Sequence, residues 1–252
     1  MALQPKFGDF VIPDVINWSE FLPSKIESED FPRRHGEIVS DVAYEGSRIV
    51  TIDGEIIKNT AADLKTSLDD LGQRLHELGR DKLRLFDDDS RYLWAIKTDY
   101  RKGRSALRAP GLASKYNLNF KCADPFWYSD TEQASAQQDP AASPHVFAVT
   151  NNGGAETPPR IEIKADGADA TDVKITNTTI GLFFQFTGTI VNGSTLIIDM
   201  DKMTVQNGGS DGRNNLASGY AFWPLVRGAN NLEYVGPVAV LIKAYWIERW
   251  AS

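Results

Sequence analysis

The sequence predicts a mainly β protein, a β-rich α+β fold, on three observations. Short runs of β-branched and aromatic residues recur along the whole chain, and Asn-Gly, Gly-Gly and Asn-Asn pairs separate many of them. One stretch in the first half has the 3.6-residue periodicity of an amphipathic helix. The second half has no comparable helix, which favours two β-rich parts with a single helix in the first.

The segment Ser40–Ile57 is predicted to be a strand, a turn and a second strand. Arg48–Ile52 is rich in β-branched residues, and Glu55–Ile57 resumes the apolar pattern. The pair Asp53-Gly54 lies between them. Because Asp and Gly both tolerate positive φ, this pair is a strong short-range signal for a tight hairpin.

The helix is predicted from Thr60 to about Gly79, some 19 residues. Its leucines are spaced 4, 3, 4 and 3 residues apart, which places them on one face: Leu64, Leu68, Leu71, Leu75 and Leu78. Thr60 is suited to cap the start, with Asp63 three residues on, and Gly79 to end the helix in a left-handed conformation. One apolar stripe of this length predicts a helix that packs on a sheet.

Further strand-like runs follow the helix. In the first half they are Leu83–Phe86, Arg91–Thr98 and Tyr116–Cys122. In the second half they are Val146–Val149, Ile161–Ile163, Val173–Ile175, Leu182–Phe186, Thr195–Asp199, Tyr220–Phe222 and Val238–Trp246. Short strands with frequent turn signals indicate a β-sandwich or jelly roll in the second half.

The segment Ser129–Pro144 holds no large apolar residue and is expected to be exposed. We therefore expect an N-terminal domain at 1–130, a linker at 131–145 and a C-terminal domain at 146–252. A long surface loop within one domain is the alternative. The final strand closes the second domain or returns to the first, and the sequence leaves both open.

Composition excludes several classes of protein. The net charge of −7 argues against nucleic-acid binding, because phosphate contacts need clustered Lys and Arg. No apolar run reaches the roughly 18 residues of a spanning helix, and the first residues lack an apolar signal core. Cys122 is the single cysteine, so no internal disulfide is expected.

The sequence offers little for catalysis or metal binding. His35, His76 and His145 lie in unrelated settings without metal-ligand spacing. The acidic triplet Asp87–Asp89 lacks the spacing of a calcium loop and is expected to be a solvated turn. The glycine-rich Asn207–Gly212 is not followed by a helix, so it does not predict a phosphate site. We expect no catalytic, cofactor-binding or metal-binding residues and no cofactor.

Two features leave alternatives open. Asp199 and Asp201 alternate out of a strand and weakly suggest the paired carboxylates of a glycosidase. Aromatic residues are frequent in the last predicted strands: Tyr220, Phe222, Trp223, Tyr245, Trp246 and Trp250. Three roles are open for them, which are filling the core, contacting a partner protein and stacking on sugar rings. A carbohydrate-binding module for host adsorption is therefore the alternative function.

The order of these features resembles the distal tail proteins of long-tailed, non-contractile bacteriophages. The helix is followed by Arg91–Ala95 and then by the aromatic strand Asn119–Tyr128, which contains Asp-Pro-Phe. Asn151-Asn152-Gly153 and Thr157–Ile161 come next, and Gly228–Leu232 precedes the final strands. The resemblance covers most of the chain, although Met1–Phe31 matches nothing in that pattern and Asn207–Ala217 is longer than its usual turn.

This resemblance implies a non-enzymatic structural hub of the phage tail tip or baseplate. Such proteins form a homo-hexameric ring, with N-terminal β-sandwich-like domains as the belt and C-terminal galectin-like sandwiches projecting outward. The ring joins the tail tube to the tail-tip hub and lets DNA pass. Expected partners are copies of the chain, the tail tube protein, the tail-associated hub protein, the tape measure protein and receptor-binding proteins, without sequence-specific nucleic-acid binding or membrane insertion. The expected location is the virion, and the host cytoplasm during assembly.

Overall fold

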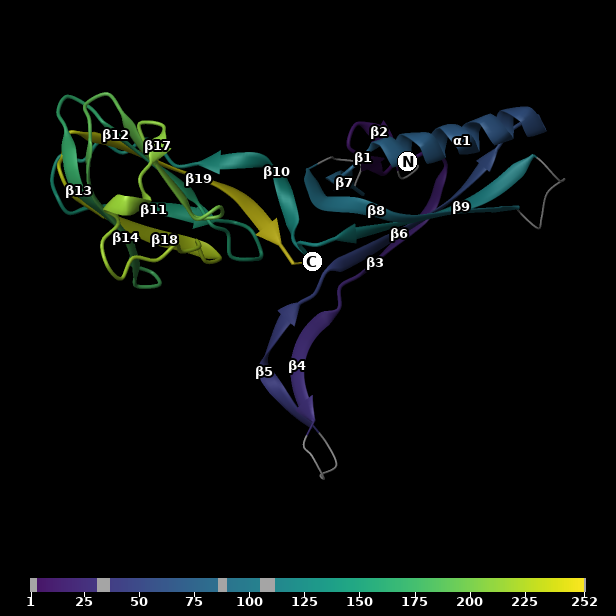
Figure 1. Cartoon of the computed structure of the whole chain (residues 1–252), viewed down its shortest axis with the longest axis horizontal. Helices are drawn as coiled ribbons and strands as arrows, with labels where there is room; N and C mark the ends of the chain where they lie inside the picture. Colours follow the sequence, from purple (N-terminus) through teal and green to yellow (C-terminus); the bar gives the residue numbers. More distant parts are fainter. Residues whose placement is uncertain (1–3, 31–36, 86–89, 105–111, 252) are drawn as a thin grey trace. The chain divides into compact units, whose positions relative to one another are not determined.

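The computed structural model of the chain describes residues 4–30, 37–85, 90–104 and 112–251 (Figure 1). It divides into two compact units, Met1–Trp127 and Tyr128–Ser252. Both are built from antiparallel strands, and one helix accompanies the strands of the first unit. The predicted mainly β fold class is confirmed.

The first unit contains one strongly bent antiparallel sheet. Its strands occur in the order β3 (Val15–Phe21), β6 (Arg48–Ile57), β9 (Ala113–Cys122), β8 (Arg91–Arg104), β7 (Asp81–Arg84), β1 (Lys6–Phe7) and β2 (Phe10–Val11). The long strand β8 pairs with β7 through its first half and with β9 through its second half. The rings of Phe7 in β1 and Phe120 in β9 lie 4.9 Å apart, so β1 and β9, which are separated by two strands in the sheet, contribute to one core.

Strand β6 runs unbroken through Asp53 and Gly54, so the predicted hairpin turn at this pair is wrong. Asp53 pairs with Asn117, and Gly54 pairs with Tyr116, in the ladder between β6 and β9. The burial of β6 alternates from its first residue to its last. Two neighbouring strands therefore override the local turn preference, because β6 fills a central position in the sheet.

The chain reverses further upstream instead. β4 (Ser24–Asp30) and β5 (Glu37–Glu45) form a separate antiparallel ladder. The backbone N–H of Gly46 donates to the carbonyl of Pro23 at 2.7 Å, between this ladder and the β3–β6 ladder. β3 to β6 thus form one long interrupted hairpin, visible in Figure 1 as four consecutive strands.

The predicted helix is present as α1 (Ala61–Glu77). The hydroxyl of Thr60 accepts a hydrogen bond from the backbone N–H of Asp63 at 3.1 Å, as its capping role requires. Leu64, Leu71 and Leu75 are buried against the sheet. The end of the helix differs from the prediction, because the C-cap residue Leu78 is extended and Gly79 does not adopt positive φ.

The second unit is a sandwich of two antiparallel sheets. One has the order β17 (Ser210–Asp211), β16 (Thr204–Asn207), β15 (Thr195–Asp199), β12 (Arg160–Ala165), β19 (Val240–Trp250) and β10 (Trp127–Ala134). The other has the order β11 (His145–Asn151), β18 (Gly228–Val235), β13 (Ala170–Asn177) and β14 (Leu182–Ile190). A 3₁₀ turn, η1 (Arg213–Asn215), follows β17.

One hydrophobic core joins the two sheets of this unit. Alternate residues of β12 and β19 face alternate residues of β13, β14 and β18, so each sheet contributes one apolar face. The final strand β19 pairs with β12 along Arg160–Ala165, so it closes the sandwich.

The segment expected to be a linker has ordered backbone contacts in the structure. β10 continues to Ala134, and the backbone N–H groups of Ser135 and Gln138 donate to carbonyls of β19 at 2.8 Å. The absence of large apolar residues does not prevent this arrangement, because backbone hydrogen bonds require no particular side chain.

Candidate functional site

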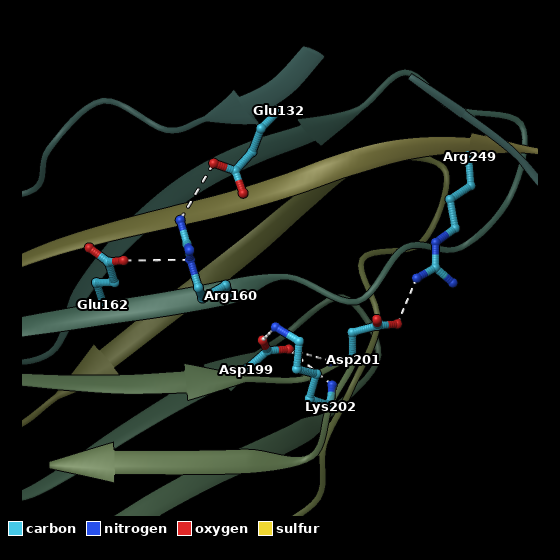
Figure 2. A network of polar contacts seen from close by, with 7 residues as sticks. All are labelled: Glu132, Arg160, Glu162, Asp199, Asp201, Lys202 and Arg249. Carbon is cyan, nitrogen blue, oxygen red and sulfur yellow. Dashed lines mark hydrogen bonds and ion pairs between the residues drawn. The ribbon is translucent and has the colours of Figure 1, made fainter. Parts of the chain in front are cut away.

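The two candidate carboxylates of the sequence lie in a polar network of the second unit (Figure 2). Asp199 ends β15, and its Oδ1 accepts backbone N–H groups of Asp201 at 3.1 Å and Lys202 at 3.0 Å. Its Oδ2 accepts the ammonium of Lys202 at 2.9 Å. Burial alone would raise the pKa of Asp199, but the hydrogen bonds from Lys202 and Asp201 outweigh it and hold that pKa below its usual value.

Asp201 is held by an arginine of the last strand. Its carboxylate lies 2.7 Å from Nη2 of Arg249, whose guanidinium also lies over the ring of Tyr128 at 5.1 Å. A glycosidase acid needs a carboxyl group with a raised pKa beside the scissile bond. Asp199 has the opposite shift and Asp201 is ion-paired, so the arrangement fits a reinforced turn better than an acid–base pair.

Arg160 occupies the centre of the rest of this network (Figure 2). The register places it opposite Asp199 on one side and Tyr245 on the other. Its guanidinium lies 3.4 Å from Glu132 and 3.5 Å from Glu162, and 4.6 Å from the centre of the Tyr245 ring. These contacts connect the outer faces of neighbouring strands, which is a structural role.

The remaining candidates lie apart from one another. His76 is exposed on α1, and His145 begins β11 with its Nε2 3.3 Å from the side-chain oxygen of Gln138. Cys122 is buried, and that burial raises the pKa of its thiol to about 12, which makes it unreactive at neutral pH. His35 and Asp87–Asp89 lie outside the described residues. Within the described ranges, no group of three or more His, Cys, Asp or Glu residues is arranged to hold a metal ion.

The aromatic residues of the last strands do not form an exposed platform. Trp223 and Trp246 are 1% and 7% exposed and belong to the core. Tyr220 is 39% exposed, but its ring packs edge-on against Phe184 and Phe222 at 5.6 and 5.7 Å. A sugar-stacking surface needs flat faces open to solvent, so this arrangement does not favour it.

Two motifs that carried the resemblance to distal tail proteins have clear physical roles. The buried amide of Asn151 donates to the carbonyls of Ala155 and Leu225 at 2.9 and 3.2 Å. The buried Asn230 bonds both the N–H and the carbonyl of Val226, at 3.0 and 2.8 Å. Each side chain bonds backbone groups of neighbouring segments, which an apolar side chain of the same size could not do.

Sequence reasoning missed a surface of the first unit, the outer face of β3, β6, β9 and β8. Phe21, Ile49, Lys121 and Ile96 are register partners in a single row across these four strands. The three apolar members are 64%, 42% and 48% exposed. The opposite face of the sheet is covered by α1, since Tyr100 of β8 donates its hydroxyl to the carbonyl of Leu68 at 3.1 Å.

The rest of this outer face is polar and ordered. Thr51 donates to the side-chain oxygen of Asn119 at 2.8 Å, and Asn117 donates to Asp53 at 2.8 Å. Its edge strand β3 pairs with β6 alone among the described strands. The sequence contained a signal for this exposed face. Ile49 and Ile57 are apolar, but the alternation of β6 places them on its outward side.

Residues 152–250 match a protein family described as siphovirus-type tail component, C-terminal domain. Over 99% of both chains, the structure is similar to the Dit protein (gp 19.1) of phage SPP1, with a TM-score of 0.79 and 16% sequence identity. That protein is described as a paradigm of the hub adsorption apparatus in phages that infect Gram-positive bacteria. A chain of the phage P2 baseplate in its activated conformation with Ca aligns over 95% of this chain and 90% of its own, at 10% identity and a TM-score of 0.40. No curated protein matches in sequence.

Residues 152–250, which cover the greater part of the second unit, thus match the C-terminal domain of siphovirus-type tail components. The resemblance to distal tail proteins that the sequence predicted is thereby supported, by this domain and by a fold shared over the whole chain. Among the described residues, no helix has both the length and the apolar character needed to cross a membrane.

Proposed function

We propose that this protein is the structural hub of a phage tail tip, forming a homo-hexameric ring that joins the tail tube to the adsorption apparatus. The family and the shared fold support a structural role in the tail hub or baseplate. In the ring, the first unit forms the belt, the sandwich projects outward, and DNA passes through the lumen. The partners are the tail tube protein, the tail-associated hub protein, the tape measure protein and receptor-binding proteins. The protein resides in the virion and in the host cytoplasm during assembly.

One observation supports self-assembly most directly, the uncovered outer face of the first unit. A row of exposed apolar side chains on an ordered sheet face is characteristic of a protein interface. Among the described strands β3 pairs only with β6, so it forms an edge of the sheet beside that face. A cyclic ring needs two different patches that meet on neighbouring subunits, and this edge and face supply surfaces of different chemistry.

The lumen of such a ring is expected to carry acidic residues, because negative walls repel DNA phosphates. The outer face of the first unit has no excess of acidic residues among the described positions. Its acidic positions Asp53, Glu55 and Asp99 are matched in number by the basic positions Arg101, Lys115 and Lys121. An acidic lumen would therefore have to come from another surface, and the surface potential of an assembled ring would test the idea.

Light scattering coupled to size-exclusion chromatography tests the ring. The expected mass is about six times 27.9 kDa. Ile49→Lys, on the exposed apolar row, should reduce the assembled fraction at least tenfold. Val191→Lys, at a position 58% exposed in the second unit, is the matched control and should leave the mass unchanged. A monomeric wild-type protein, together with phage particles that lack it, would contradict the proposal.

The proposal also states that the protein works without making or breaking a covalent bond. Asp199→Asn combined with Asp201→Asn removes both candidate carboxylates while preserving side-chain size. Phage carrying this double variant should remain infectious, provided that the protein still assembles into particles. Particles that assemble normally but lose infectivity, together with hydrolysis of host glycans by the wild-type protein alone, would show an enzyme.

A further inference from the structure

Strand β11 is an edge strand without the features that usually protect such strands. Its seven residues read His-Val-Phe-Ala-Val-Thr-Asn, with no Asp, Glu, Lys, Arg or Pro. All seven pair with β18 without a bulge. Proteins normally prevent edge-to-edge pairing with charges, prolines, bulges or very short strands. β11 is long and regular, and His145 is its only side chain with an ionisable group.

The side of β11 away from β18 is open. Among the described residues, no backbone hydrogen bond joins His145–Asn151 to a segment other than its partner strand. Val146 is 56% exposed, and Ala148 and Thr150 are exposed on the same outer face. Phe147 and Val149, at the alternate positions, are buried in the core.

Two of the other edge strands, β14 and β17, are protected. The far edge of β14 is covered by the segment after η1, because Ala217 and Ala221 donate to the carbonyls of Gln185 and Phe183 at 3.1 and 2.9 Å. Strand β17 has only two residues, and its Asp211 is paired with Arg213 at 2.8 Å. Protection at these edges makes the open edge of β11 a specific feature of the sandwich.

We infer that β11 pairs antiparallel with β11 of a second copy of this chain. A two-fold axis through residue 148 would place Ala148 opposite itself, Val146 opposite Thr150, and Phe147 opposite Val149. The strand is thus complementary to itself, since small and β-branched residues meet outside and core residues meet inside. No like charges face each other, and two four-stranded sheets become one continuous eight-stranded sheet.

This contact goes beyond the proposed ring and does not depend on it, because it lies within the second unit. One strand pair buries little area, so a single contact gives a weak, concentration-dependent dimer. In a ring, six such contacts would act together and strengthen the association of two rings without any new interaction. The two-fold contact is isologous, whereas the ring contact is heterologous, so the two can be tested separately.

The test uses the position that faces itself. Ala148→Lys places two ammonium groups opposite each other across the two-fold axis, so pairing should weaken at least tenfold and the mass at high protein concentration should fall by half. Ala148→Glu should behave in the same way. An equimolar mixture of the two variants should recover the wild-type mass, because Lys then faces Glu.

Ala229→Lys is the matched control. Ala229 is exposed and lies on the central strand β18, opposite Thr150 of β11, so its substitution adds the same charge away from the edge. Analytical ultracentrifugation of the full chain supplies the masses, and circular dichroism confirms that each variant is folded. In the wild type, hydrogen exchange of β11 amides should also slow as the protein concentration rises.

Three results would each overturn the inference. The first is a wild-type protein whose β11 amides exchange at the same rate at all concentrations. The second is an Ala148→Lys mass equal to that of the wild type. The third is a mixture of the Lys and Glu variants that fails to recover. None of these results bears on the hexameric ring, which is tested at Ile49 in the first unit.

Discussion

The phenol ring of Tyr116 fills the space that a side chain at residue 54 would need. A Cβ atom placed on Gly54 would lie 2.2 Å from both the Cζ atom and the hydroxyl oxygen of Tyr116. The hydroxyl donates a hydrogen bond to the carbonyl of Pro13, so the ring cannot swing aside without losing a buried interaction. Burial, followed by the charge of Asp14, raises the pKa of Tyr116, which keeps the hydroxyl protonated as a donor.

Gly54→Ala should therefore destabilise the first unit. Overpacking a filled site costs about 1–3 kcal/mol, and the fixed ring places this site at the upper end of that range. Gly79→Ala is the control, because nothing lies within 4 Å of a Cβ at that position and its φ is not positive. Thermal unfolding followed by circular dichroism measures both. Equal melting temperatures for the Gly54 variant and the wild type would show that the ring moves freely.

The same contact explains why a local pattern failed at this site. Asp53-Gly54 is a turn signal when only its sequence neighbours are considered. In the folded chain, β3 and β9 pair with β6 on either side, and Tyr116 needs a residue without a side chain at position 54. That need arises from a residue 62 positions away, and no short window contains it.

The helix was predictable because its signals are local. The leucine spacing and the Thr60 cap are properties of one turn or two, and the structure retains both. Gly79 is the exception, since the chain leaves the helix through the extended Leu78 and needs no left-handed residue. Local sequence signals thus predict the helix and its first residue, whereas the position of the following strand determines where the helix ends.

Leu71→Ala should test how much the helix contributes to the first unit. Leu71 is 1% exposed and lies at the centre of the buried stripe, so its truncation should cost about 2–5 kcal/mol. Leu68→Ala, at a half-buried position of the same helix, should cost less. Urea unfolding gives both values. A loss below about 0.5 kcal/mol for Leu71 would mean that the stripe is not packed in solution.

The surfaces that we propose for assembly were harder to predict than the fold. Alternation identifies Ile49 as facing away from Val50, but it does not tell which of the two faces another element covers. Coverage depends on where α1 packs, and that is a tertiary property. The motifs that carried the family resemblance are local, and they include Asn151 and Asn230, whose side chains bond backbone groups of this sandwich.

Asp199 should make the second unit sensitive to acid. Its pKa in the folded protein lies below its ordinary value of 3.8, so the unfolded chain binds a proton more readily than the folded chain does. The stabilisation is therefore fully present above about pH 4 and is lost as the pH falls through the folded pKa. Asp199→Asn should lower stability at pH 7 and flatten its decline below pH 4.

Denaturant unfolding between pH 2 and pH 7 measures this effect. Asp139→Asn, which changes an exposed carboxylate, serves as the control and should follow the wild-type curve. Parallel curves for the wild type and Asp199→Asn below pH 4 would show that the hydrogen bonds from Lys202 do not persist in solution.

Arg48 should be among the most sensitive charged positions of the first unit. It is 1% exposed, lies 2.8 Å from Glu20, and donates from Nε to the carbonyl of Pro125 at 2.9 Å. Its guanidinium also lies 5.8 Å from the centre of the Trp127 ring, so it holds the segment at the end of the unit in place. Loss of the contacts of Arg48 is costly, because a guanidinium this deeply buried needs partners in place of water.

A double-mutant cycle separates the ion pair from the packing of the arginine stem. Arg48→Met keeps most of the buried volume and should cost about 1.5–3 kcal/mol, the range for hydrogen bonds to charged groups. Glu20→Gln should cost less, since Glu20 is 31% exposed and water can reach its partner. If the pair is coupled, the double variant should be more stable than the sum of the two losses predicts, by at least about 0.5 kcal/mol. Strictly additive losses would show that Arg48 stabilises the unit through Pro125 and Trp127 alone.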